Sequence, residues 1–150
     1  GITWGIAAEI SLAPDGPYRL EEETGFILNI LPETRVSDFT ANFNSRDTFL
    51  LRDTAGKTVT DGYVGTGMTL SRYDGQGRLL DTVTAVVRGD LSGDGIITTV
   101  DYLRVRGIFA NTYAAAPAIR KAADVNGDGT VFSVDYMQIR GHFSGTYTIR

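Results

Sequence analysis

Residues 89–113 read GDLSGDGIITTVDYLRVRGIFANTY, and residues 123–147 read ADVNGDGTVFSVDYMQIRGHFSGTY. The two stretches align without a gap and share nearly half of their residues, so the chain contains an internal repeat. Each copy begins with an acidic, glycine-rich loop and continues into a segment with apolar residues at helical spacing. Two copies are too few for a solenoid, so we interpret the repeat as a duplicated site.

Each loop has the spacing of an EF-hand calcium loop, in which alternate residues supply oxygens and glycine at position 6 permits the sharp turn. A carboxylate at position 12, one helical turn further on, closes the coordination sphere. The predicted ligands of the first loop are Asp90, Ser92, Asp94, Ile96 through its carbonyl, Thr98 and Asp101. Those of the second loop are Asp124, Asn126, Asp128, Thr130 through its carbonyl, and Asp135. The sequence therefore predicts two bound calcium ions.

Two other interpretations of the loops are open. A pair of Asp/Gly-rich β-turns would share the composition, but it would not explain an aspartate at position 12 in both copies. Magnesium is the weaker metal candidate because it is reluctant to lose its water ligands. Phe132 occupies position 9 of the second loop, so water or another oxygen would have to serve there.

Composition narrows the range of functions. The chain has 150 residues, 42% hydrophobic residues and a formal net charge of −4, which is typical of globular proteins. It has no cysteine and one histidine, His142, which argues against disulfides, thiolate zinc sites and histidine-based catalytic centres. No apolar run is long enough to span a bilayer. We expect no enzyme, since no nucleophile–base–acid set is visible, and neither a nucleic-acid nor a membrane partner.

The element pattern predicts an α+β chain of two domains. Strands are expected at 26–31, 48–52, 62–64, 68–72 and 80–87, with a short helix at 37–43. Residues 1–88 are thus predicted to form a small β-rich domain with one short helix. Residues 89–150 are predicted to be all-α, with two calcium loop–helix segments. With no Pro/Ser-rich linker at residue 88, we expect the two parts to pack together.

The helix after the first loop, 99–110, is expected to bury one apolar face. Tyr102, Val105 and Phe109 lie on that face, matched by Tyr136, Ile139 and Phe143 in the second copy. The segment before the first loop is a strand, with Val83, Ala85 and Val87 alternating. Each unit is therefore loop–helix, without the entering helix of an EF-hand, and this makes a calcium sensor that opens on binding a poor hypothesis.

The stretches DLSGDGIITTVDYLRVRG and DVNGDGTVFSVDYMQIRG resemble the duplicated segments of dockerins. This resemblance implies a calcium-dependent module that binds a cohesin of a scaffoldin or a cell-surface anchoring protein. It further implies a short helix between the two loop–helix segments, which residues 117–123 fit, with Pro117 in the first turn. It also implies an extracellular or bacterial cell-surface location in a cellulosome-type complex, and a monomer before that complex forms. By its position and β character, the N-terminal domain resembles the X module that precedes some dockerins.

The dockerin resemblance also implies which residues contact the partner, at loop positions 10 and 11 and along the outward face of each helix. These are Thr99, Val100, Leu103, Arg104 and Gly107 in the first copy, and Ser133, Val134, Met137, Gln138 and Gly141 in the second. The two glycines either allow close approach of a partner backbone or mark the helix ends. The outward apolar stripe needs a cover, which could be a partner or the preceding domain.

An alternative function remains open. The protein could be a calcium-stabilised surface adhesin or carbohydrate-binding fragment, in which the loops serve only stability.

Overall fold

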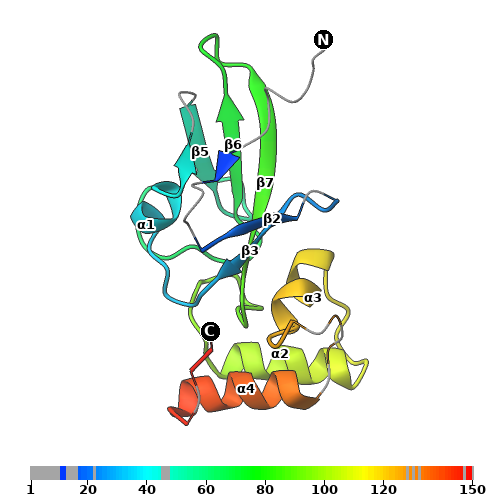
Figure 1. The fold of residues 1–150 in the computed structure, drawn as a ribbon. Coiled ribbons are helices and arrows are strands. Elements are labelled where there is room, and N and C mark those ends of the chain that lie inside the picture. Colours follow the sequence, from blue (N-terminus) through cyan, green and yellow to red (C-terminus); the bar gives the residue numbers. More distant parts are fainter. Residues whose placement is uncertain are drawn as a thin grey trace.

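The computed structural model describes residues 11–12, 17–21, 23–44, 48–127, 129, 131, 133–146 and 148–149. Along these residues a five-stranded sheet comes first and the longer helices come last, so the predicted α+β class is confirmed. Figure 1 shows the strands at one end of the molecule and the C-terminal helices at the other.

The sheet has the strand order β2-β3-β7-β6-β5. These strands are β2 (Arg19–Glu21), β3 (Phe26–Ile30), β7 (Leu79–Val87), β6 (Thr69–Tyr73) and β5 (Thr48–Arg52). Neighbouring strands are antiparallel except β3 and β7, which are parallel. A separate antiparallel pair joins β1 (Ser11–Leu12) to β4 (Phe43–Asn44), and the short helix α1 (Val36–Thr40) precedes β4.

The central strand β7 sends alternate side chains to opposite faces of the sheet. Val83, Ala85 and Val87 are buried in the N-terminal core, whereas Val86 belongs to a cluster on the other face. The other buried members of the N-terminal core are Ile27, Ile30, Val36, Phe39, Phe43, Leu51, Val64 and Leu70. The N-terminal core therefore covers one face of β7, and the cluster that includes Val86 and Ala122 covers the other.

Four of the five predicted strands lie within a residue of β3, β5, β6 and β7. The predicted strand at 62–64 is wrong: Tyr63 makes only an isolated bridge to Arg35. Gly62 has a φ of 83°, which interrupts an extended backbone at this point. The helix predicted at 37–43 is α1, which ends at Thr40 because the chain enters β4 at Phe43.

The C-terminal part contains α2 (Thr99–Phe109), α3 (Pro117–Ala123) and α4 (Ser133–Ser144), with α2 packed against α4. Its buried core consists of Leu91, Ile97, Val105, Ile108, Ala123, Val125, Ile139 and Ile149. Among the described residues, no helix is long and apolar enough to cross a membrane.

The apolar helix face differs in part from the prediction. Val105 and Ile139 are fully buried as expected, but Phe109 and Phe143 are exposed, and Ile108 takes the buried position instead. Residues 101, 105 and 108 also share a helical face, and this face is rotated about the helix axis from the predicted face at 102, 105 and 109. The aromatic side chains pack along the edge between the helices, with ring centroids 6.0 Å apart for Tyr102–Tyr136 and 5.5 Å for Phe109–Tyr136.

The helix α3 packs against the face of the sheet that the N-terminal core leaves free. Leu28, Val86 and Ala122 form one buried cluster there. The Gly89 N–H donates to the Ala122 carbonyl at 2.9 Å, and Lys121 Nζ lies 3.0 Å from Glu21 Oε2. The expectation that the two parts pack together is therefore confirmed (Figure 1).

Candidate functional site

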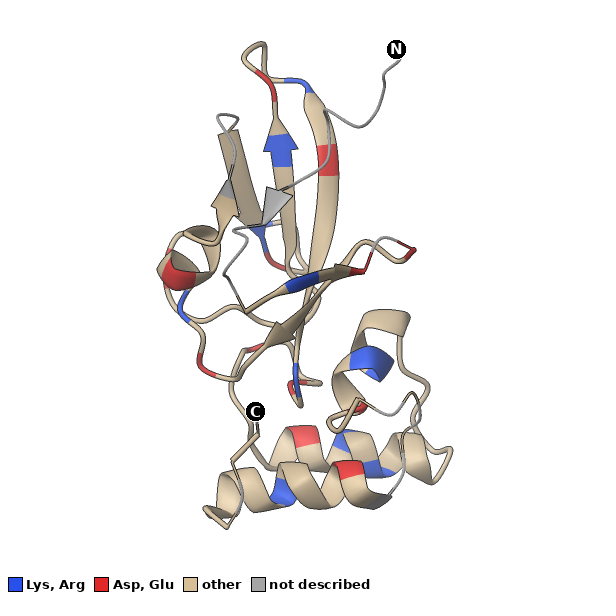
Figure 2. Ribbon diagram, viewed as in Figure 1, with Lys and Arg blue, Asp and Glu red and all other residues tan. Residues whose placement is uncertain are grey.

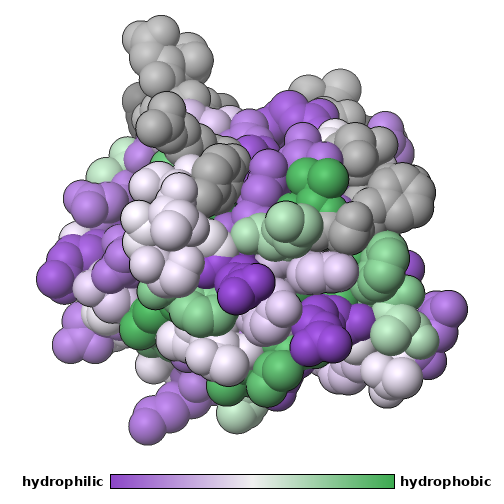
Figure 3. All heavy atoms as spheres, turned by 90° about the horizontal axis from the view of Figure 1, so that it is seen from below, coloured by the Kyte–Doolittle hydropathy of each residue, from purple (hydrophilic) through white to green (hydrophobic). Residues whose placement is uncertain are grey.

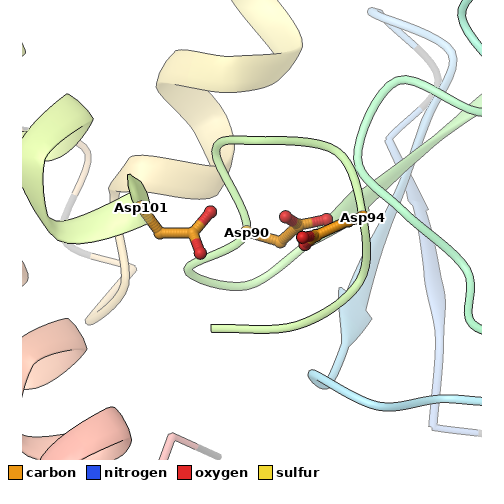
Figure 4. A group of neighbouring side chains, drawn as sticks. All are labelled: Asp90, Asp94 and Asp101. Carbon is orange, nitrogen blue, oxygen red and sulfur yellow. The ribbon is translucent and has the colours of Figure 1, made fainter. Parts of the chain in front are cut away.

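The first loop brings three predicted ligands together. Asp90, Asp94 and Asp101 each offer a carboxylate oxygen, and these oxygens lie within 4.8 Å of one another. Asp101 points from the first turn of α2 toward the other two carboxylates (Figure 4). The site therefore presents the hard oxygen donors that calcium prefers.

Backbone N–H groups hold these carboxylates in place. Asp101 Oδ1 accepts from the Leu91 and Ser92 N–H groups at 2.9 Å, and Oδ2 accepts from the Thr98 N–H at 2.8 Å. Asp90 accepts from Gly93 N–H through Oδ1 and from Gly95 N–H through Oδ2. The chain can fold so tightly because both glycines have positive φ, 88° and 79°.

The donor set fits a bound cation because two of its carboxylates are buried without a basic side chain to offset their charge. Asp90 and Asp101 are fully buried, and among the described residues neither forms an ion pair with a lysine or arginine. Burial raises the pKa of Asp90 to about 6 against backbone hydrogen bonds that favour the charged form, and the charge of Asp101 adds to the rise. A divalent cation at this point would offset both the desolvation and the repulsion.

The other predicted ligands of the first loop surround these carboxylates. The Ser92 hydroxyl lies within hydrogen-bond distance of both Asp94 Oδ1, at 3.0 Å, and Asp90 Oδ1, at 3.3 Å. The Ile96 N–H donates to Asp94. Thr98 is the N-cap of α2 and forms a capping box with Asp101. Position 12 therefore both closes the loop and caps the first turn of the helix.

The second loop repeats part of this arrangement. The Gly129 N–H donates to Asp124 Oδ2 at 2.8 Å, as Gly95 does to Asp90, and the Asn126 N–H donates to Asp135 Oδ1, as Ser92 does to Asp101. Asp135 is fully buried. Asp101 and Asp135 are the acidic residues of α2 and α4 (Figure 2). The predicted ligands Asp128 and Thr130, and Phe132, lie outside the described residues.

Part of the predicted partner surface is exposed. Thr99 is exposed, and the exposed fractions of the apolar side chains are 47% for Val100, 56% for Leu103, 47% for Val134 and 62% for Met137. The side chain of Ser133 lies outside the described residues. The N-terminal part does not cover the stripe, so one of its two expected covers is excluded among the described residues. Viewed from below, the end of the molecule that holds α2 and α4 exposes apolar residues among polar ones (Figure 3).

Arg104 and Gln138 occupy matching positions and are only partly exposed. Arg104 donates to the Leu91 carbonyl at 3.2 Å, and its guanidinium lies 5.8 Å from the ring centroid of Tyr113. Among the described residues, Gln138 Oε1 is a buried oxygen without a hydrogen-bond partner. Both side chains thus lie at the edge of the stripe.

The prediction that Gly107 and Gly141 face outward is wrong, because both are buried. The Gly107 carbonyl accepts from the Thr112 N–H, and the Gly141 carbonyl accepts from the Thr146 N–H, each at 2.8 Å. A Cβ on Gly107 would lie 2.8 Å from Tyr113 Cβ. Glycine is therefore needed where the chain folds back over the helix end, and no partner backbone has access there.

Two contributors to the first loop were not predicted from the sequence. The Thr66 N–H donates to Asp90 Oδ2 at 2.9 Å, and the Glu33 N–H donates to the Gly95 carbonyl at 2.8 Å. Both donors are backbone groups of the N-terminal part, so no side-chain pattern could indicate them.

The C-terminal helical part of the chain is similar to a known family of domains. Residues 88–144 match the family model of the dockerin type I domain, and this range contains both loops and all three C-terminal helices. Searches of curated proteins and of solved structures found no match. Domains of this family are non-catalytic assembly modules that bind cohesins, generally bind calcium, and are typically secreted or displayed at the cell surface. Residues 88–144 of this protein are therefore similar to dockerin type I domains.

Proposed function

We propose that this protein is a non-catalytic assembly module that binds a cohesin in a calcium-dependent manner. In this role it attaches its parent protein to a cellulosome-type or cell-surface complex outside the cell. The observation that carries the proposal is the exposed apolar stripe, Val100 and Leu103 on α2 with Val134 and Met137 on α4, within a dockerin type I domain.

The stripe has the energetic character of a docking surface. Complete burial of a Val, Leu or Met side chain stabilises a complex by about 1.5–3 kcal/mol before the costs of association. Four such side chains at roughly half exposure leave a substantial part of this free energy for a partner. Arg104 and Gln138 beside them offer polar groups for specificity.

Calcium has a structural role in this proposal. The first ion would be held by Asp90, Ser92, Asp94, Ile96, Thr98 and Asp101, and the second by Asp124, Asn126, Asp128, Thr130 and Asp135. A bound ion supplies positive charge that neutralises the carboxylates and ties each loop to its helix. The position-12 aspartates lie in the first turns of α2 and α4, so the residues of each loop would set the position of the helix that carries the stripe.

The test is capture of the full chain by a panel of immobilised cohesins, with calcium or with chelator. Capture by at least one cohesin in calcium, and its loss in chelator, is expected. Leu103→Asp should weaken capture by a hundredfold or more, since it places a charge in the apolar contact. Leu79→Asp is the matched control, because Leu79 is equally exposed, at 57%, but lies on β7.

Two outcomes would contradict the proposal. If no cohesin of the panel captures the chain in calcium, a calcium-stabilised adhesin or carbohydrate-binding fragment becomes the better hypothesis. If Leu79→Asp and Leu103→Asp weaken capture equally, the contact surface is not the stripe.

A further inference from the structure

The first calcium loop lies against a segment of the N-terminal part that is remote in sequence. Thr66 donates its backbone N–H to Asp90 Oδ2 at 2.9 Å, the same oxygen that accepts the Gly95 N–H at 2.8 Å. Two N–H groups therefore occupy Oδ2, while Oδ1 lies beside the Ser92 hydroxyl that also reaches Asp94. The contact with Thr66 consequently orients Asp90 without occupying the oxygen that faces the other ligands.

The backbones of the two segments are in close contact. A Cβ on Gly65 would lie 1.9 Å from the Gly93 carbonyl oxygen, and a Cβ on Gly95 would lie 2.5 Å from the Val64 carbonyl oxygen. No real Cβ atom tolerates such distances. Glycine is thus required on both sides of the contact, once in the loop and once in the N-terminal part.

The segment that contacts the loop is itself firmly attached to the sheet. Thr66 is almost fully buried, and its hydroxyl donates to the Val87 carbonyl at 3.1 Å and accepts from the Val87 N–H at 2.9 Å. The Gly67 N–H donates to the Ala85 carbonyl at 2.9 Å. Because Val87 and Ala85 lie in the central strand, the position of Asp90 is coupled to the sheet.

The described glycines of the second loop are not packed against another segment of the chain in this way. Asp124, the counterpart of Asp90, is only half-buried, and its Oδ2 accepts from Gly129 within its own loop. A Cβ on Gly127 or on Gly129 would meet nothing within 4 Å, in contrast to Gly93 and Gly95. The two loops are therefore alike in their own geometry and differ in their surroundings.

We propose that the segment from Val64 to Gly67 is the outer shell of the first calcium site, which makes the two calcium sites unequal. The first site is preorganised by the N-terminal part and binds calcium more tightly, and calcium there stabilises both parts of the molecule together. This inference rests on the calcium binding of the proposed function. Changes to outer-shell partners of metal ligands typically weaken metal affinity by about 10–100-fold.

The experiment is calorimetric titration of the full chain with calcium chloride, comparing Gly65→Ala with Gly75→Ala. Neither glycine has a left-handed φ, and a Cβ on Gly75 meets nothing within 4 Å, so Gly75→Ala is the matched control. We expect two sites of unequal affinity in the unchanged chain. Gly65→Ala should weaken the tighter site by about tenfold or more and leave the weaker site unaltered, and Gly75→Ala should change neither.

A measurement on the unchanged chain covers the case in which Gly65→Ala does not fold. In a titration followed by amide resonances, the Thr66 N–H should shift with the first equivalent of calcium and not with the second. Equal affinities of the two sites, an unshifted Thr66 amide, or a folded Gly65→Ala chain with unaltered affinities would each overturn the inference. Absence of any calcium binding would instead contradict the proposed function itself, so the two failures are distinguishable.

Discussion

Asp101 shows how much a single residue does in the first loop. Its carboxylate accepts hydrogen bonds from the N–H groups of Leu91, Ser92 and Thr98, and it completes the acidic cluster with Asp90 and Asp94. Asp94 is exposed and caps no helix. The two aspartates thus contribute to the same candidate site, but only Asp101 is needed for the folded loop itself.

Replacement of these two residues should separate calcium binding from loop folding. In chelator, we expect Asp101→Ala to lower the free energy of unfolding by about 1–3 kcal/mol, because buried N–H groups lose their acceptor. Asp94→Ala should change it by less than about 0.5 kcal/mol in chelator but should remove most of the stabilisation that calcium adds. Urea denaturation of both variants with and without calcium tests this; equal losses in chelator would contradict it.

At the scale of elements, α2 and α4 end in the same way although their surfaces differ. A glycine carbonyl inside each helix, Gly107 or Gly141, accepts an N–H from the chain that folds back, Thr112 or Thr146. The side chain of Tyr113 then covers Gly107. The helix ends are therefore part of the fold and leave the outward stripe as the free surface.

This arrangement predicts an unusual sign for one substitution. Alanine normally stabilises a helix interior by up to about 1 kcal/mol relative to glycine. Gly107→Ala should instead destabilise the protein by about 1–3 kcal/mol, since its Cβ would lie 2.8 Å from Tyr113 Cβ. Thermal unfolding in calcium measures the effect, and a raised melting temperature would show that the chain after α2 moves freely.

At the scale of the whole molecule, two kinds of contact join the parts. One is the apolar cluster of Leu28, Val86 and Ala122, and the other is the polar contact of the first loop with Thr66 and Glu33. The ion pair of Lys121 with Glu21 lies at the edge of the apolar cluster, with more than a third of the lysine side chain exposed. We therefore expect the apolar cluster to dominate the stability of this junction.

Two substitutions on α3 should distinguish these contributions. Ala122→Asp places a charge in a fully buried position, so it should lower the free energy of unfolding by about 3 kcal/mol or more and split the unfolding transition in calorimetry. Lys121→Ala should cost at most about 1 kcal/mol and keep a single transition. Similar effects of the two changes would mean that the junction is electrostatic.

The same ion pair predicts a small dependence of stability on pH. The hydrogen bond from Lys121 lowers the pKa of Glu21 below its usual value, so the folded state favours the charged carboxylate. The resulting stability is present above the unfolded pKa and is lost as the pH falls through the lower folded pKa. Glu21→Gln should remove this part of the acid sensitivity, as urea denaturation between pH 3 and roughly pH 6 would reveal; an unchanged pH profile would contradict it.

The spacing of acidic, glycine and apolar residues along the sequence was enough to predict the acidic loops, the helices that follow them and most strands. Alternation along 80–87 and the repeated acidic loops depend on neighbours within one element, where side-chain direction follows from periodicity. The division into domains at residue 88 and the likeness to an X module remain predictions. The strand predicted at 62–64 was wrong because these residues bond to Thr34 and to the start of α1. The Val64 N–H donates to the Thr34 carbonyl, and the Val36 N–H donates to the Gly62 carbonyl.

What only the tertiary structure decided is how the parts meet. The Thr66 N–H on Asp90, the contact of Gly65 with Gly93 and the burial of Gly107 under Tyr113 are made by backbone atoms or by the absence of a side chain. Such contacts leave no periodic pattern in a sequence, because every residue has a backbone N–H and a glycine suits many turns. The sequence by itself thus determined two similar acidic loops, and the tertiary structure decided that their surroundings differ.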